Sequence, residues 1–320
     1  MQKTFELTTE VLELMEGLKL QKKKISSKYF YDSEGSRIFQ QIMGMSEYYL
    51  TNCEAEIFET NKRTISRMFC DKCGAIDLVE LGAGDGQKTQ ILLEILLSEN
   101  TPFRYIPIDI SEEAGYQLVG KIRGRFPDLV VESRTGDYFH MLEDLSHDYP
   151  NRKVVMFLGS NLGNFNLKKS INFLAQLNRA MRPDDLLFIG LDLKKDPEVI
   201  RSAYNDPHGF TRDFNLNLLR RMNRELGADF NPDLFRHEPC YDPDTGAAKS
   251  YLVSTVDQEV YFHCSDETIS FRKWEAIYTE RSQKYDLPMI RNLSGKSGFQ
   301  VVKNFFDHNQ YFVNSLWKKQ

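Results

Sequence analysis

Three alternating glycines follow a run of apolar residues in the first third of the chain. They are Gly82, Gly84 and Gly86, and they lie in the segment ELGAGDGQKT, residues 80–89. Glycine adopts backbone angles that other residues avoid, and it lets a ligand contact the main chain. Such a loop between a strand and a helix is typical of cofactor-binding sites in open α/β sheets.

The spacing of these glycines distinguishes between cofactors. A dinucleotide-binding loop has the pattern GxGxxG, whose third glycine would replace Gln87. The pattern here is GxGxG, preceded by Glu80 at the end of the expected strand. Close backbone contact and nearby carboxylates suit a sulfonium with an amino acid tail better than they suit a pyrophosphate. We therefore expect S-adenosylmethionine (SAM), with S-adenosylhomocysteine as its product, rather than a dehydrogenase cofactor.

Acidic residues follow the next two expected strands. Asp109 ends the segment RYIPID, where its carboxylate can accept hydrogen bonds from both ribose hydroxyls. Asp137 lies in the segment TGDYF and can accept from the adenine amino group, with Tyr138 beside the ring. Alternatively, Asp109 caps the helix that begins in SEEAG. The common register of the glycine loop and both acids favours cofactor binding.

Strands and helices alternate along the middle of the chain, which predicts a parallel sheet with helices on both faces. The expected strands are 75–82, 103–111, 128–137, 153–160 and 184–193, separated by helices at 88–99, 112–126, 138–145 and 166–181. The β-rich tail at 299–319 is expected to return to this sheet.

A second group of elements interrupts this alternation. It comprises helical segments within 5–70, helices at 196–206 and 211–226, a turn in 237–249, and antiparallel strands at 250–264 and 268–280. A helix is expected to resume from about residue 285, after this group. We expect an α/β protein whose Rossmann-like SAM-dependent methyltransferase sheet covers residues 60–194 plus 286–320. A second, α+β substrate-binding domain is expected to cover residues 1–59 plus 195–285.

Composition argues against several other classes of protein. The 320 residues carry a formal net charge of −5, so the chain lacks the basic excess that is typical of proteins that bind nucleic acid. No apolar run approaches the roughly 20 residues of a membrane helix, and the N-terminus lacks a secretory signal pattern, so we expect a cytoplasmic protein. Nothing resembles a coiled coil, and we expect a monomer that acts on a small molecule.

Cysteine and histidine do not form a metal-binding pattern. Five cysteines give no disulfide framework, and the single CxxC motif, Cys70 and Cys73, precedes a strand instead of opening a helix. A zinc site would need a second pair of ligands at matching spacing. The six histidines are scattered along the chain. We expect reduced thiols and no metal.

Four longer segments resemble one enzyme family. They are KYFYDSEGSRIFQQIMGMSEYYLTNCEAEIF, VELGAGDGQKT, FLGSNLGNF and GLDLKKD. They are similar to the L-histidine Nα-methyltransferases of ergothioneine biosynthesis. This family also includes the methyltransferase part of ovothiol synthases and fungal enzymes that N-methylate tryptophan derivatives. The resemblance runs from about residue 22 to the C-terminus. It implies SAM-dependent trimethylation of the histidine α-amino group to hercynine.

The resemblance also implies roles for individual residues. The family's cofactor-binding residues match Gly82, Gly84, Lys88, Asp109 and Asp137. Its substrate-carboxylate ligands match Asn164 and Tyr204, its pocket residues match Tyr31, Tyr48 and Thr211, and its imidazole ligands match Glu280 and Ser282. Tyr48, Asn164 and Tyr204 form the implied catalytic set.

The imidazole ligands favour histidine among amino acid substrates. Glu280 and Ser282 are two residues apart on an expected strand, so both side chains face one way. Together they can bind both ring nitrogens, whereas an indole has one N–H and would leave a polar group unpaired. Alternatively, Glu280 pairs with Arg281 or Lys284 on a solvated face.

One difference from the histidine enzymes leaves the identity of the amino acid substrate undecided. Where they carry a methionine in the pocket wall, this chain has Ser250. A smaller, polar wall can admit another substrate, such as a tryptophan derivative, tyrosine or 5-thiohistidine. A non-enzymatic SAM or amino acid binding protein is a further alternative. A protein or nucleic-acid methyltransferase is disfavoured by the lack of a basic face.

Overall fold

The computed structural model describes residues 9–71, 74–109, 112–148 and 150–320. The chain divides into two compact units, between which it passes three times. The unit that we call the sheet unit consists of Leu50–Lys194 and Gln283–Gln320, and the hairpin unit consists of Met1–Tyr49 and Lys195–Ser282.

The first boundary between the units lies at the start of a long helix, α3 (Tyr49–Phe69). The sequence-based boundary at residues 59 and 60 falls inside this helix. Its two phenylalanines Phe58 and Phe69 pack against Phe188 in the sheet, with ring centroids 5.9 and 5.2 Å apart. These contacts attach the second half of α3 to the sheet, and all of the helix from Leu50 onward belongs to the sheet unit.

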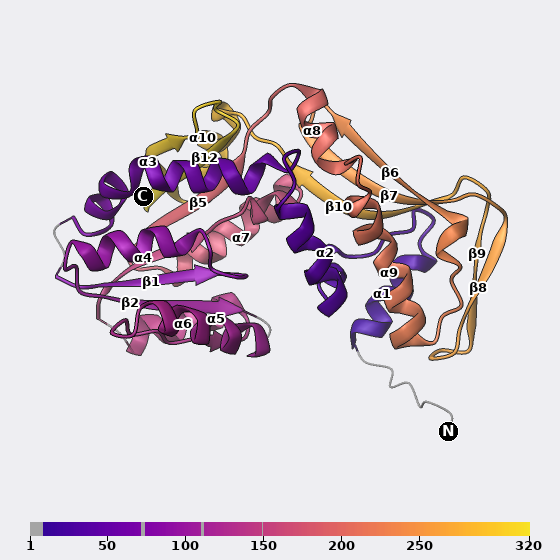
Figure 1. The fold of residues 1–320 in the computed structure, drawn as a ribbon, viewed down its shortest axis with the longest axis horizontal. Helices are drawn as coiled ribbons and strands as arrows, with labels where there is room; N and C mark the ends of the chain where they lie inside the picture. Colours follow the sequence, from indigo (N-terminus) through magenta and orange to yellow (C-terminus); the bar gives the residue numbers. More distant parts are fainter. Residues whose placement is uncertain (1–8, 72–73, 110–111, 149) are drawn as a thin grey trace. The chain divides into compact units, whose positions relative to one another are not determined.

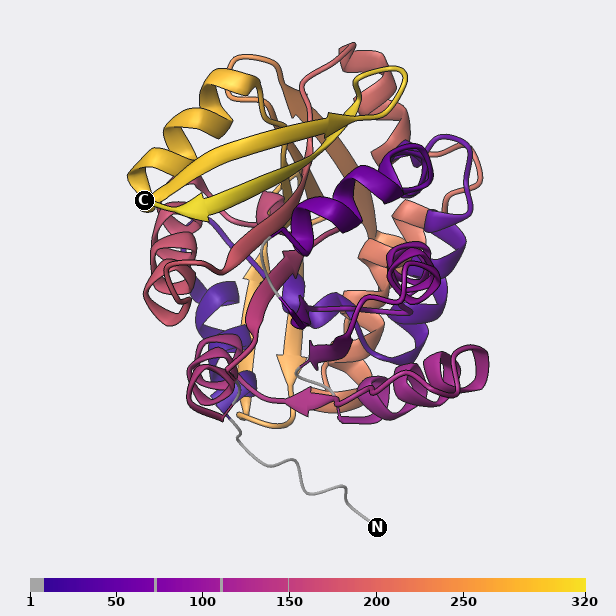
Figure 2. The same ribbon diagram turned by 90° about the vertical axis from the view of Figure 1, so that its left-hand side faces the viewer.

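The central sheet has seven strands in the order β11-β12-β5-β4-β1-β2-β3 (Figure 1). They are β1 (Ile76–Leu81), β2 (Phe103–Asp109), β3 (Arg134–Thr135), β4 (Arg152–Phe157), β5 (Leu186–Asp192), β11 (Phe299–Phe306) and β12 (Phe312–Lys319). Strands β1 to β5 are parallel, whereas β12 runs antiparallel to β5 and to β11. The expected return of the C-terminal segment to the sheet is confirmed, and Figure 2 shows these two last strands side by side. The strand order reverses at β1, so the loops after β1 and β4 open at the switch point where such sheets bind ligands.

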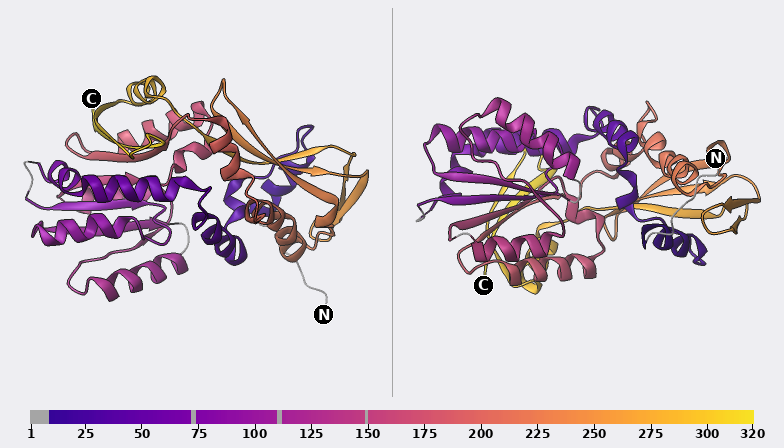
Figure 3. Two further views of the ribbon diagram at one scale, coloured as in Figure 1. Left: turned by 45° about the horizontal axis from the view of Figure 1, so that its top comes forward. Right: turned by 90° about the horizontal axis from the view of Figure 1, so that it is seen from below.

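Helices cover both faces of this sheet, as Figure 3 shows. One face packs against α6 (Tyr138–Asp148), α7 (Leu167–Ala180) and α10 (Leu287–Lys296) through a shared apolar core. The other face is covered by α3, α4 (Thr89–Ser98) and α5 (Glu112–Arg125). Thr89 at the start of α4 donates to Glu80 of β1, and Arg125 of α5 donates to Gln90 of α4. The predicted Rossmann-like α/β sheet is therefore confirmed.

The third strand is much shorter than the predicted 128–137. Only Arg134–Thr135 forms a strand, and Val131 makes one isolated bridge to Tyr105. Leu129 and Val131 are both buried, so the apolar pattern that predicted a strand reflects packing against the sheet. A short strand at the sheet edge also limits pairing with other chains.

The hairpin unit combines helices with two small antiparallel sheets. Its helices are α1 (Thr9–Lys19), η1 (Ser27–Phe30), α2 (Ser33–Met43), α8 (Pro197–Tyr204), α9 (Phe210–Leu226) and η3 (Pro232–Leu234). Its strands are β6 (Phe235–Asp242), β7 (Ala247–Ser254), β8 (Gln258–Phe262), β9 (Glu267–Phe271) and β10 (Ala276–Gln283). Strands β10, β7 and β6 form one sheet in that order, and β8 pairs with β9. Apolar residues of α1, α2 and α9 share one core with these strands.

The turn predicted within residues 237–249 is confirmed at residues 243–246, and strands β6 and β7 flank it. Strand β6 continues to Asp242, and the turn to β7 ends at Gly246, which has a φ of 71°. Pro239 lies within β6, which is an edge strand, the position in a sheet where proline is tolerated. No helix in the described part of the chain is long and apolar enough to span a membrane.

Candidate active site

The glycine loop lies at the carboxyl edge of the central sheet, between β1 and α4. Gly82, Gly84 and Gly86 have φ angles of 67°, 57° and 64°. A Cβ atom on Gly82 would lie 3.0 Å from the hydroxyl of Tyr138, whereas one on Gly84 would have no described atom within 4 Å. The loop is therefore open at Gly84, where a ligand can approach the main chain.

The predicted acidic residues gather beside this loop. Asp109 ends β2, and Asp137 directly precedes Tyr138 at the start of α6. Burial, and then the charges of Asp109 and Asp137, raise the pKa of Tyr138 to about 12. The Oδ1 atom of Asp137 accepts from the backbone N–H groups of Phe139 and His140, at 3.0 and 3.3 Å. Asp137 therefore also caps α6 and orients the segment that carries Tyr138.

Glu80, near the end of β1, is an ionisable residue that is buried in the protein interior. It is 3% exposed and accepts hydrogen bonds from Thr89 Oγ1 at 2.9 Å and Tyr105 Oη at 2.6 Å. Burial raises the pKa of Glu80 to about 7, although both hydrogen bonds act in the opposite direction. Its protonation state therefore changes near neutral pH.

Lys88, the predicted loop lysine, pairs with a carboxylate that sequence reasoning missed. The partner is Glu54 of α3, which is fully buried. The same helix buries four apolar residues around it, which are Leu50, Cys53, Ile57 and Phe58. The signal in the sequence was an acid within the apolar stripe of a helix, because such an acid needs a partner in the interior.

Asn164, a predicted ligand of the substrate carboxylate, ends the short helix η2 (Asn161–Asn164) after β4. The preceding Gly159 and Ser160 both have positive φ, and Ser160 at 58° is a buried residue that is not glycine. The hydroxyl of Ser160 accepts from the backbone N–H of Asp192 at 3.1 Å. Left-handed backbone at such a residue costs on the order of 1 kcal/mol and is common at functional sites. This turn places Asn164 at the same carboxyl edge as the glycine loop.

The other predicted substrate residues all belong to the hairpin unit. Tyr31 and Tyr48 both contact the ring of Phe39, with centroid distances of 5.5 and 6.0 Å. Burial of its hydroxyl raises the pKa of Tyr31, and the charges of Glu280 and Tyr204 raise it further. The residue as a whole is 52% accessible to solvent. Glu280 and Tyr204 therefore both lie within electrostatic range of the Tyr31 hydroxyl.

The position of Tyr31 is determined by the residue that follows it. Asp32 caps α2 by accepting from the backbone N–H of Gly35 at 2.7 Å, and it also accepts from Asn217 of α9 at 2.9 Å. The ring of Tyr31 contacts Phe214 of the same helix at 5.8 Å. Phe39 and Phe214 are aromatic members of this cluster that sequence reasoning missed.

A chain of buried hydrogen bonds runs through the hairpin unit to Glu280. Thr279 Oγ1 donates to Asn215 Oδ1 at 2.7 Å and lies 3.0 Å from the carbonyl oxygen of Ser250. Asn215 Nδ2 donates to the carbonyl of Thr211 at 3.0 Å. The hydroxyl of Ser250 in turn donates to Glu280 Oε2 at 3.2 Å. Asn215 and Thr279 were not identified from the sequence.

The two predicted imidazole ligands lie on a strand, as expected. Glu280 and Ser282 both belong to β10, and Ser282 is 7% exposed. Lys284, one of the alternative partners considered for Glu280, forms a fully buried ion pair with Asp192 in the sheet unit, at 2.6 Å. The solvated-face alternative therefore has little support at this lysine.

Thr211, the remaining predicted pocket residue, is buried near the start of α9. Its backbone N–H donates to Asp206 Oδ1 at 2.8 Å. Its hydroxyl makes no hydrogen bond of good geometry with the described residues, although it faces the same carboxylate. A buried hydroxyl without a well-aligned partner can accept one from a bound ligand.

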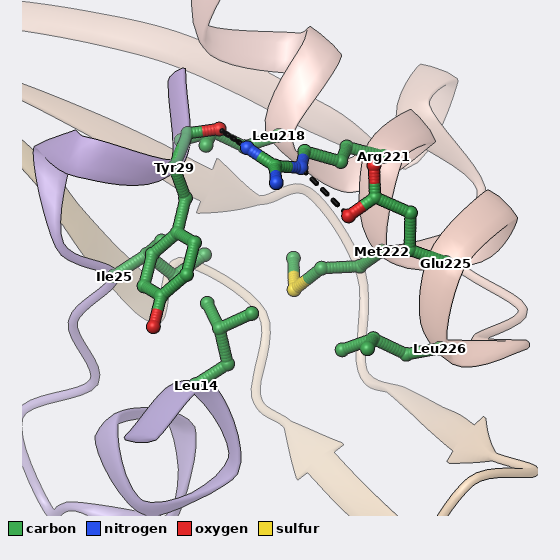
Figure 4. Close-up of a pocket in the computed structure, with 8 residues that line it drawn as sticks. All are labelled: Leu14, Ile25, Tyr29, Leu218, Arg221, Met222, Glu225 and Leu226. Atoms are coloured by element: carbon green, nitrogen blue, oxygen red, sulfur yellow. Dashed lines mark hydrogen bonds and ion pairs between the residues drawn. The ribbon is translucent and has the colours of Figure 1, made fainter. Parts of the chain in front are cut away.

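A separate small pocket in the hairpin unit does not involve the predicted site (Figure 4). Arg221 at its rim donates to the carbonyl of Tyr29 and to Glu225 Oε2, both at 2.8 Å. Its lining consists of Leu14, Ile25, Tyr29, Leu218, Arg221, Met222, Glu225 and Leu226. Because its polar groups pair with each other and its walls belong to the core, we interpret it as a packing crevice.

One cysteine of the CxxC motif lies within the described residues. Cys70 is half-buried, and Cys73 lies outside the described residues. Within the described ranges, the structure contains no group of three or more His, Cys, Asp or Glu residues arranged to hold a metal ion.

Comparison with known proteins identifies the family. The strand order, the glycine loop and the acids after β2 and β3 define a Rossmann-like sheet of the kind that binds nucleotide-containing cofactors. The family model described as "Histidine-specific methyltransferase, SAM-dependent" matches residues 10–319, and the chain belongs to this family.

Curated relatives match along most of the chain. A histidine N-alpha-methyltransferase of Mycobacterium tuberculosis is 33% identical over 307 residues, covering 96% of this chain and 94% of the relative. A histidine N-alpha-methyltransferase of Mycolicibacterium smegmatis is 35% identical over 269 residues, covering 84% of this chain and 82% of the relative. The ergothioneine biosynthesis protein 1 of Schizosaccharomyces pombe is 25% identical over 309 residues, covering 92% of this chain but 39% of that protein.

Proposed function

We propose that the protein transfers methyl groups from SAM to the α-amino nitrogen of L-histidine, three times in succession, to give hercynine. The observation that carries this proposal is family membership over residues 10–319, together with similarity to two histidine N-alpha-methyltransferases along most of both chains. The glycine loop, the carboxylates beside it and the Ser250–Glu280 contact support it.

The cofactor side of the proposed site consists of residues of the sheet unit. Gly82 and Gly84 bring the main chain close to the ligand, Asp109 accepts from the ribose hydroxyls, and Asp137 and Tyr138 flank the adenine. The open space at Gly84 fits a bound ligand, because a side chain there would meet no described atom. When bound, SAM supplies a methyl group on a positively charged sulfur.

The substrate side of the proposed site binds the two ends of histidine. Asn164 and Tyr204 bind the carboxylate, and Glu280 and Ser282 bind the ring nitrogens. The hydrogen bond from Ser250 restrains the carboxylate of Glu280. Ser250, the residue that differs from the histidine enzymes, therefore supports Glu280 as a ligand of the imidazole ring. A restrained carboxylate favours a ring with two nitrogens over an indole, which would leave one polar group unpaired.

Positioning accounts for most of the rate enhancement that we propose. The attacking amine must be neutral, with its lone pair directed at the methyl carbon, so holding both ends of the substrate supplies the required orientation. The rings of Tyr31 and Tyr48 can stabilise the developing ammonium by cation–π attraction. Because none of the proposed anchors binds the α-nitrogen, the same residues serve all three transfers.

Turnover with SAM across the common amino acids tests the substrate. We expect mass spectrometry to detect trimethylated histidine and no methylated tryptophan or tyrosine. If histidine is ignored while tryptophan or tyrosine is trimethylated, the substrate is wrong but the chemistry stands. Tight SAM binding without any product from any amino acid would instead identify a binding protein.

Substitution of Glu280 tests the proposed ring contact. We expect Glu280→Ala to raise the KM for histidine at least about tenfold, the effect of losing one hydrogen bond to a charged group, with little change in the KM for SAM. A matched control is Glu275→Ala, which removes an acid paired with Lys23 just before the same strand. Equal changes in both KM values for Glu280→Ala would contradict the ring contact.

We further propose that the protein acts as a monomer in the cytoplasm, on free amino acids. Light scattering coupled to size-exclusion chromatography tests the oligomeric state, and a dimer would contradict it.

A further inference from the structure

A fully buried carboxylate lies behind the glycine loop. Glu54 of α3 forms an ion pair with Lys88, and its Oε1 atom accepts from Asn314 Nδ2 of β12 at 2.8 Å. The backbone N–H of Gly159 points at both carboxylate oxygens, 3.0 Å from Oε2 and 3.2 Å from Oε1. One carboxylate therefore joins three segments that are far apart in the sequence.

The surrounding structure is shaped to hold this charge. A buried carboxylate is costly unless it is paired and hydrogen-bonded, and Glu54 has a cation, a backbone donor and a side-chain amide. Strand β5 has Gly190 beside it, where a Cβ would lie 2.3 Å from Glu54 Oε1. A side chain at residue 190 would therefore displace the carboxylate.

Two of the segments that Glu54 joins are the loops at the switch point of the sheet. Lys88 ends the glycine loop after β1, and Gly159 begins the loop after β4 that leads to Asn164. A Cβ on Gly159 would lie 3.6 Å from Lys88 Nζ, so the two loops are neighbours at this point. Both loops belong to the sheet unit, as does Glu54.

We propose that Glu54 is a positioning residue that holds the cofactor loop and the Asn164 loop in one arrangement. It acts through Lys88 and the backbone of Gly159, so its loss weakens the binding of cofactor and of amino acid together. The amino acid part of this inference rests on the proposed function of Asn164, whereas the cofactor part requires only the SAM site.

A second buried carboxylate in the same sheet provides a matched control. Asp77 of β1 is fully buried, pairs with Arg104 at 2.8 Å and accepts from Asn151 Nδ2 at 3.1 Å. It therefore has a cation and an asparagine amide as partners, as Glu54 does. Asp77 lies near the start of β1, at the edge of the sheet opposite to the glycine loop.

The experiment compares Glu54→Gln with Asp77→Asn in the full-length chain. Calorimetry measures the Kd of S-adenosylhomocysteine without turnover, steady-state kinetics measure the KM for SAM and for the amino acid, and thermal denaturation measures Tm. We expect both variants to lower Tm. Only Glu54→Gln should weaken S-adenosylhomocysteine binding about tenfold or more, the effect of one charge-assisted hydrogen bond, and raise both KM values.

Wild-type affinity and KM values in Glu54→Gln, with only a lower Tm as in Asp77→Asn, would overturn the proposal. If Glu54→Gln does not fold, Asn314→Ala decides, because it removes one donor to Glu54 without touching either loop. We expect about threefold weaker S-adenosylhomocysteine binding for Asn314→Ala, and unchanged affinity would overturn the proposal.

Failure of this inference can be told apart from failure of the proposed function. The amino acid measurements use whichever amino acid the wild-type protein methylates, and the S-adenosylhomocysteine measurement uses none. Wild-type protein that ignores histidine would therefore reject the proposed substrate while leaving this test intact.

Discussion

Glu80 makes the stability of the protein depend on pH in a way that one substitution can reveal. Burial raises the pKa of this carboxyl to about 7, from an ordinary value of 4.5. The folded protein therefore holds a proton that the unfolded chain releases at lower pH. Stability from this group is fully present below the ordinary pKa and is lost as pH rises through the folded pKa of about 7.

The size of the effect follows from the size of this change. At about 1.4 kcal/mol for each pKa unit, ionised Glu80 destabilises the fold by about 3 kcal/mol relative to the protonated form. Glu80→Gln removes this penalty and preserves the shape of the side chain. The hydroxyls of Thr89 and Tyr105 can each donate or accept, so both hydrogen bonds can be kept.

We expect Glu80→Gln to be more stable than wild type by up to about 3 kcal/mol at about pH 8.5 and by less than about 1 kcal/mol at about pH 5. Urea denaturation at both pH values measures the difference in the free energy of unfolding. Asp77→Asn serves as the control, because leaving Arg104 without its partner should destabilise the fold at both pH values. A difference between Glu80→Gln and wild type that is the same at both pH values would refute the reasoning.

Three further predictions concern the site and the hairpin unit. We expect Ser250→Ala to raise the KM for histidine about fivefold, because Glu280 loses a net hydrogen bond of about 1 kcal/mol, and an unchanged KM would contradict this. Gly82→Ala and Gly84→Ala should each cost about 1 kcal/mol in backbone strain, and Gly84→Ala should also weaken S-adenosylhomocysteine binding in calorimetry, because its methyl group occupies the open space of the loop. Burial lowers the pKa of His237 to about 4, so acidification below its ordinary value of 6.5 costs the folded protein up to about 3 kcal/mol. His237→Gln should therefore lose less stability than wild type between about pH 7 and about pH 4 in urea denaturation, and equal losses would contradict the buried neutral histidine.

Much of the fold could be predicted because its signals are local. The alternation of apolar strands with helices specified the parallel sheet, and the β-rich tail specified its return to that sheet. The prediction was wrong where an apolar pattern had two explanations. Leu129 and Val131 are buried by packing with little strand pairing, so the third strand is shorter than predicted.

The site could be predicted where its residues form continuous motifs. The glycine loop, Asp109 and Asp137 follow three successive strands, so their gathering at one edge follows from the parallel order. The roles of Glu280, Ser282 and Asn164 came from the family resemblance and stay predictions. Phe39, Asn215 and Thr279 could not be identified, because each is an ordinary residue of its element until its neighbours are known.

The sequence by itself determined the class of cofactor, the family and the edge of the sheet at which the cofactor loop lies. Only the tertiary structure decided what holds that loop. Glu54 and Asn314 are 260 residues apart in the chain, yet one hydrogen bond joins them behind Lys88. The physical reason is that a buried charge is stable only with its partners in place, and those partners are selected by packing rather than by distance along the chain.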